Sequence, residues 1–148
     1  MSRSINQAGV ELIKSFESCR LDAYQDVRGI WTIGWGHIAG VTEGMVYSQA
    51  EADAALLEDL RGAEGAVERG IGAASTTDNQ FGAMVSLCYN IGAGAFAGST
   101  VLRQHCAGAH QAAADAFLMW NKATIDGVLK EVAGLTRRRN AERTLYLT

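Results

Sequence analysis

The run from residue 22 to residue 47 limits the fold more than any other part of the chain. Residues that favour strands alternate there with glycines: Tyr24, Ile30, Trp31, Ile33 and Trp35 with Gly29, Gly34, Gly36, Gly40 and Gly44. Because glycine destabilises a helix interior by about 1 kcal/mol relative to alanine, this run is a poor helix. The pattern predicts a small antiparallel sheet with a turn near residues 26–29.

On both sides of this run, apolar residues recur at helical spacing. Ser4 with Gln7 resembles a capping box, and the pattern that follows predicts a helix over about residues 5–19. Further boxes begin at Ser48 and Thr77. The helix after Thr77 is apolar on almost every side, which is typical of a helix buried at the centre of a bundle.

The rest of the chain also favours helices. Short helices are predicted over residues 99–105, 111–121 and 136–147, while four glycines weaken the helix around residues 62–72. Residues 122–133 follow no pattern that we can assign. The chain has 148 residues, 48% of them apolar, which is enough for one globular domain. The predicted elements make this an α+β domain. Its small antiparallel sheet lobe spans about residues 20–47, and its larger all-helical lobe spans about 5–19 and 48–148.

Charge and composition exclude several classes of function. The net charge of −3 argues against a nucleic-acid partner. Cys19, Cys88 and Cys106 are odd in number and widely spaced, so we expect free thiols buried as small core residues in a reducing compartment. The histidines are scattered and lack the spacing of a metal-ligand set, so no metal site is predicted. No cofactor is predicted either. We find no apolar run that would serve as a signal peptide or membrane span, so we expect a cytosolic protein without stable membrane insertion.

Three residues point to chemistry. Glu17 borders the apolar stripe of the first helix, where partial desolvation favours the neutral form of a carboxyl group, whereas Asp26 opens an exposed turn. Two carboxyls held in different protonation states can cleave a glycosidic bond, one as general acid and one as base. The hydroxyl of Thr32, across the hairpin, would position the attacking water. The alternatives are a solvated helix glutamate, an aspartate that caps its own turn and a plain strand threonine.

The spacing of these residues resembles the active-site signature of phage-type lysozymes, the endolysins of glycoside hydrolase family 24. A glutamate, an aspartate nine residues later and a threonine six after that precede Gly34-Trp-Gly36-His37. The resemblance extends over nearly the whole chain and is closest to lysozymes of short-tailed enteric phages. The further matching segments are 89–92, 96–103, 112–117 with Trp120, and 137–146.

The resemblance implies a lysozyme-like fold with a cleft between the lobes. It also implies a monomeric muramidase that hydrolyses, with inversion, the β-1,4 bond between N-acetylmuramic acid and N-acetylglucosamine in bacterial peptidoglycan. Such an enzyme waits in the host cytoplasm, reaches the periplasmic peptidoglycan through a holin-type pore and lyses the host. A lytic transglycosylase, which needs only one acid, and a non-catalytic peptidoglycan-binding module are the alternatives.

The resemblance also assigns supporting roles. His37 would be a structural histidine paired with Asp59 or, second, with Glu58. Asn90 matches an amide that lines the cleft, although helix-end asparagines are common. Arg139 would face Glu17 and hold the acid in place, against the alternative that the arginine run is a solvated face.

Overall fold

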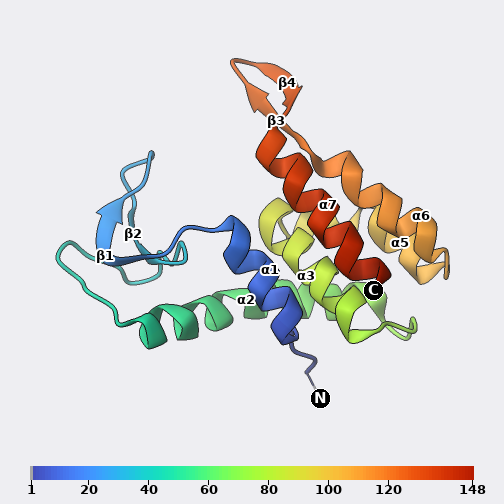
Figure 1. Ribbon diagram of the computed structural model, residues 1–148, viewed down its shortest axis with the longest axis horizontal. Coiled ribbons are helices and arrows are strands. Elements are labelled where there is room, and N and C mark those ends of the chain that lie inside the picture. The colour runs from blue at the N-terminus through green and yellow to red at the C-terminus, as the bar shows by residue number, and fades with distance from the viewer. Residues whose placement is uncertain (1) are drawn as a thin grey trace. The chain divides into compact units, whose positions relative to one another are not determined.

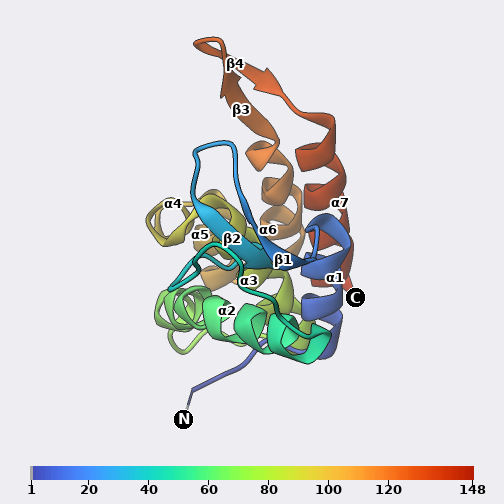
Figure 2. The same cartoon turned by 90° about the vertical axis from the view of Figure 1, so that its left-hand side faces the viewer.

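The computed structural model describes residues 2–148, which divide into two compact units (Figures 1 and 2). One unit is Ile13–Arg61, and the other combines residues 2–12 with Gly62–Thr148. The chain passes between them within helix α1 (Gln7–Phe16) and within helix α2 (Gln49–Ile71). Helix α1 is shorter than the helix predicted over residues 5–19.

The Ile13–Arg61 unit contains the predicted sheet. Strand β1 (Arg20–Gln25) pairs antiparallel with β2 (Trp31–Gly34), and Tyr24 lies opposite Thr32. The chain turns between them over residues 26–30, which confirms the predicted hairpin. Its apolar core contains fully or almost fully buried side chains from the helices and from β2: Ile13, Ile33, Ala52, Leu56 and Leu60.

The Gly34-Trp-Gly36-His37 segment is a tight reversal of the chain. Gly34 has φ +64° and Gly36 has φ +94°, values that residues with a side chain rarely adopt. The reversal lets Ile33 and His37 exchange two backbone hydrogen bonds of 2.9 Å. Gly34 also lies against α2, because an added Cβ atom would be 3.2 Å from that of Ala52. The two glycines are thus required by geometry, and they fix His37 beside β2.

The second unit is built around helix α3 (Asp78–Ile91), which is buried over residues 80–88, as predicted for a central helix. Thr77 and Gln80 form the predicted capping box. Helix α7 (Ala133–Leu147) packs along α3. The remaining helices are α4 (Ala93–Ala97), α5 (Thr100–Cys106), α6 (His110–Ala116) and the 3₁₀ helix η1 (Phe117–Trp120).

Helix ends differ from the sequence prediction at two places. The first helix is capped by Asn6, whose Oδ1 accepts a 3.0 Å bond from the N–H of Gly9, rather than by Ser4. Helix α2 continues unbroken through Gly62 and Gly65 and stops before Gly72, which has φ +51°. Its predicted capping box at Ser48 is present, because Ser48 and Glu51 exchange hydrogen bonds of 2.9 and 3.1 Å.

The prediction of helices up to the end of the chain is wrong at residues 122–131. Strands β3 (Lys122–Ile125) and β4 (Val128–Glu131) form a second antiparallel hairpin, so the larger lobe is not all-helical. Its turn consists of Asp126 and Gly127, both with positive φ, the arrangement that two-residue hairpins favour. In Figure 1 this hairpin projects past the beginning of α7.

The cysteines are only partly as predicted. All three are free thiols, but only Cys88 is buried, while Cys19 is half-buried and Cys106 is exposed. Burial raises the pKa of Cys88 to about 11. The expectation that all three are core residues is therefore wrong for Cys106, which lies in the last turn of the short helix α5.

No helix within residues 2–148 is both long enough and apolar enough to cross a lipid bilayer.

Candidate active site

Glu17 lies directly after the last residue of α1. Its backbone N–H donates to the carbonyl of Ile13 at 3.1 Å, so the residue continues the hydrogen-bond pattern of the helix. Glu17 is half-buried, and Ile13 is fully buried. The predicted position of a carboxyl group at the end of the first helix is thus confirmed, a few residues before β1 begins.

Asp26 is held by the turn that it opens. Its Oδ1 accepts hydrogen bonds from the backbone N–H groups of Arg28 at 2.8 Å and Ile30 at 3.0 Å. Its Oδ2 accepts from Nε and Nη2 of Arg28 at 3.3 and 3.0 Å. The bond from Ile30, followed by those from Arg28, lowers the pKa of Asp26 below its ordinary value. Asp26 therefore caps its own turn, as the alternative interpretation expected, and the same bonds favour an ionised carboxylate.

Thr32 and Asp26 are joined through one peptide group. The hydroxyl of Thr32 donates to the carbonyl of Ile30 at 2.9 Å, and the backbone N–H of Asp26 donates to the same oxygen at 2.9 Å. Thr32 is buried, with 4% of its surface exposed. Since its hydrogen is committed to Ile30, the hydroxyl oxygen keeps its lone pairs available to accept a hydrogen bond.

His37 pairs with a carboxylate of α2. Its Nδ1 lies 2.9 and 3.0 Å from the two carboxylate oxygens of Asp59, the first of the two predicted partners. Glu58, the second candidate, instead pairs with Arg61 at 3.2 Å on the surface of α2. Together with its backbone bonds to Ile33, this pair ties the end of the reversal to α2.

A second set of contacts that the sequence did not predict holds the same reversal. Trp35 donates from its indole nitrogen to Oδ1 of Asp53 at 2.8 Å. Nζ of Lys14 lies 3.3 Å from that oxygen and 5.5 Å from the centre of the Trp35 ring. The bond from Trp35 is the main reason that the pKa of Asp53 is lowered. The available signal was the indole N–H itself, which needs an acceptor when it is partly buried.

Asn90 and Arg139 lie together in the second unit. Nη2 of Arg139 donates to Oδ1 of Asn90 at 2.9 Å, and its Nε lies 2.7 Å from Oε1 of Glu142 in an ion pair whose N–H is not aligned as a hydrogen bond. Glu142 also accepts a 2.5 Å bond from Ser86. Arg139 and Glu142 are fully buried, so the solvated-face alternative is wrong for Arg139. That Arg139 faces Glu17 stays a prediction.

The contact with Arg139 fixes the orientation of the Asn90 amide. Arginine has only donors, so the amide oxygen of Asn90 must face it. Asn90 is exposed at the end of α3, and its NH₂ group therefore remains to donate to an outside acceptor. Burial lowers the pKa of Arg139 and raises that of Glu142, and the two side chains offset this by pairing with each other.

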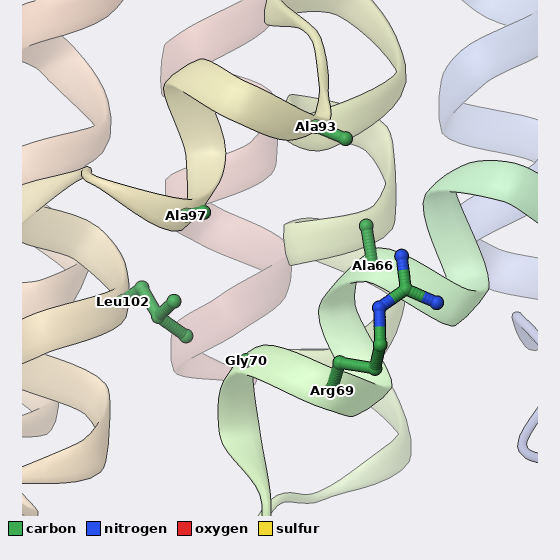
Figure 3. Close-up of a pocket in the computed structure, with 6 residues that line it drawn as sticks. All are labelled: Ala66, Arg69, Gly70, Ala93, Ala97 and Leu102. Atoms are coloured by element: carbon green, nitrogen blue, oxygen red, sulfur yellow. The ribbon is translucent and has the colours of Figure 1, made fainter.

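The second unit also has a cavity of about 420 Å³ between α2, α4 and α5 (Figure 3). Its lining is mostly small or apolar, with one cation: Ala66, Arg69, Gly70, Ala93, Ala97 and Leu102. None of the predicted site residues lines it. Among residues 2–148, no three histidine, cysteine, aspartate or glutamate side chains are grouped as a metal site would need.

Comparisons with known proteins show the family of the chain. The phage lysozyme family model matches residues 14–142. The endolysin of Salmonella phage P22 is 42% identical over 149 residues, covering 97% of this chain and 98% of the relative.

Solved structures show the same fold. The muramidase domain of SpmX from Asticaccaulis excentricus has a TM-score of 0.90 at 44% identity, with 99% of both chains covered. The endolysin from Escherichia coli O157:H7 phage FAHEc1 has a TM-score of 0.90 at 39% identity, with coverage of 98% of this chain and 94% of that one. The expected lysozyme-like α+β fold is thus confirmed, and the chain belongs to the phage lysozyme family.

Proposed function

We propose that the protein is a muramidase that hydrolyses the β-1,4 bond between N-acetylmuramic acid and N-acetylglucosamine in bacterial peptidoglycan. Membership of the phage lysozyme family supports this proposal. The observation that carries it is the pair Asp26 and Thr32, which both donate hydrogen bonds to the carbonyl of Ile30. They lie nine and fifteen residues after the half-buried Glu17. An ionised carboxylate and a hydroxyl acceptor, both fixed, are what the activation of a water molecule requires.

In the proposed reaction, Glu17 donates its proton to the glycosidic oxygen as the bond from that oxygen to the anomeric carbon breaks. A water molecule attacks the same carbon from the opposite face and gives a proton to Asp26. The second O–H of the water donates to the free lone pair of Thr32. With both hydrogens held, a lone pair of the water is left to point at the sugar. Attack from the opposite face inverts the anomeric configuration.

Asn90 would contribute to substrate binding. Its NH₂ group suits an acceptor on the glycan, and the acetamido carbonyl oxygen of either sugar has the right chemistry. Arg139 acts through Asn90 as a positioning residue. Substitution of Asn90 by Asp, which removes the donors, should raise KM more than it lowers kcat.

Two substitutions test the reaction type. Glu17→Gln and Asp26→Asn should each lower kcat by about 10²–10⁴, the usual contribution of general acid–base groups. Arg61→Ala, an exposed residue of the same unit, is the matched control and should keep full activity. A lytic transglycosylase would instead release anhydro ends and tolerate Asp26→Asn. A non-catalytic binding module would show no loss of peptidoglycan turbidity even in the wild-type protein.

We further propose that the enzyme acts as a monomer in host lysis and depends on a separate membrane pore to reach the peptidoglycan. Relatives that are endolysins support a role in host lysis. Expression in a Gram-negative host should leave the culture turbid, and co-expression of a pore-forming membrane protein should clear it. Clearing without the pore former would contradict the dependence.

A further inference from the structure

Both oxygens of the Asp26 carboxylate already accept hydrogen bonds. An ionised carboxylate offers about four lone-pair sites, two on each oxygen. The backbone N–H groups of Arg28 and Ile30 donate to Oδ1, and Nε and Nη2 of the Arg28 guanidinium both donate to Oδ2, at 3.3 and 3.0 Å. A water that is to lose a proton must first donate a hydrogen bond to this group. In the observed arrangement Arg28 therefore competes with the attacking water for Oδ2.

The two oxygens differ in how easily they can be opened. Oδ1 is held by backbone groups that form the turn itself. Oδ2 is covered only by the Arg28 guanidinium, whose side chain is 67% exposed. Rotation of this side chain would free Oδ2, while the backbone bonds keep Asp26 in place. The bond from Ile30, which contributes most to the low pKa of Asp26, also stays.

An exposed cation leaves a carboxylate most readily when another carboxylate replaces it. The exchange keeps the guanidinium paired, and two parallel N–H bonds suit carboxylates in particular. The proposed substrate carries such groups on the muramic acid residue, either on the attached peptide or as the lactyl carboxylate where the peptide is missing. A glycan without carboxylates offers no replacement.

We propose that Arg28 is a specificity-determining residue that binds a carboxylate of the substrate, and that this transfer of its guanidinium away from Asp26 opens Oδ2 to the attacking water. The inference rests on the proposed role of Asp26 as the base. It makes the enzyme selective for anionic glycan, because an anionic substrate draws Arg28 away from the base and a neutral one does not.

The test compares three forms of one polymer. The first is peptidoglycan with its peptides, the second is the glycan after an amidase has removed the peptides, and the third is this glycan with its lactyl carboxylates converted to amides. The enzymes are wild type, Arg28→Ala, Arg28→Gln, Arg28→Lys and the control Arg61→Ala. The readout is the ratio of kcat/KM on each anionic form to kcat/KM on the neutral form.

We expect wild type and Arg61→Ala to prefer the anionic forms. Arg28→Ala and Arg28→Gln should lower that preference at least about threefold, within the range that exposed ion pairs support, and Arg28→Lys should retain part of it. On the neutral form, Arg28→Ala should be as fast as wild type or faster. Raising ionic strength from about 0.05 M to about 0.5 M should weaken the preference of wild type and Arg61→Ala, and should change little in Arg28→Ala and Arg28→Gln.

The anionic forms identify the ligand. A preference confined to the first form assigns Arg28 to carboxylates of the peptide, and a preference confined to the second form assigns it to the lactyl carboxylate. A preference for both forms means that either carboxylate draws Arg28 away from Asp26. Equal changes on all three substrates in Arg28→Ala would overturn the inference, because Arg28 would then act only on Asp26. Failure of the proposed function looks different: wild type would cleave no form, or Asp26→Asn would stay active.

Discussion

The buried pair of Arg139 and Glu142 should contribute much more to stability than the surface pairs of the same unit. Glu142→Gln keeps the volume of the side chain but removes its charge, 2.7 Å from Nε of Arg139 and within 2.5 Å of Ser86. Both members of the pair are 0% exposed. Removing one partner of a buried pair costs about 3–5 kcal/mol, because the remaining charge stays desolvated. At about 2–4 °C per kcal/mol for a chain of this size, Tm should fall by about 6–20 °C.

Urea unfolding followed by circular dichroism, with thermal melts in the same buffer, measures this loss. Asp115→Asn is the matched control. Its partner, Arg143, also lies on α7 at 2.8 Å, but the two side chains are 54% and 32% exposed, so the loss should stay near 0–1 kcal/mol. If Glu142→Gln is no more destabilising than Asp115→Asn, the argument from burial is wrong.

Three further predictions concern pH, backbone strain and the attacking water. Burial, and then nearby His110 and Arg3, lower the pKa of His105, whose Nδ1 lies 2.5 Å from the Tyr146 hydroxyl. The stability that His105 contributes should be present above about pH 6.5 and lost as pH falls through its pKa in the folded protein. Between pH 8 and pH 5, Tm should therefore fall less in His105→Gln than in wild type. Gly36→Ala should cost about 1–2 kcal/mol in urea unfolding, because only its positive φ opposes a side chain, and Gly34→Ala should cost more. Thr32→Ala should lower kcat about tenfold with little change in KM, and Thr32→Ser should restore most of it.

Local features of the fold were predictable from the sequence. The capping boxes at Ser48 and Thr77 join residues three apart, and the reversal at Gly34 depends on backbone freedom that only glycine has. Helix α2 was harder, because its packing overrides the weak propensity of Gly62 and Gly65. The β3–β4 hairpin was missed since its strands are short and mostly exposed and so show no burial pattern. The Asp126-Gly127 pair, which suits a two-residue hairpin turn, was a signal that could have indicated it.

The candidate site also combines residues identified from local sequence with contacts set by tertiary packing. Glu17, Asp26 and Thr32 lie within one short segment, so the sequence pattern and the family resemblance together identified them. The partners that tune them depend on side-chain geometry instead. No spacing rule states that Arg28 covers Oδ2 of Asp26, or that Glu142 is buried beside Arg139. Charged residues are expected on the surface, and only tertiary packing places this pair inside.

The anomeric configuration of the first product tests the central claim most directly. Proton NMR recorded during cleavage of purified glycan strands should show new reducing ends that appear first as the α anomer, because inversion of a β bond gives α. Asp26→Asn should give no such signal. Reducing ends that appear first as the β anomer, or anhydro ends without a reducing group, would contradict the account in which Glu17 and Asp26 act as acid and base on a water molecule.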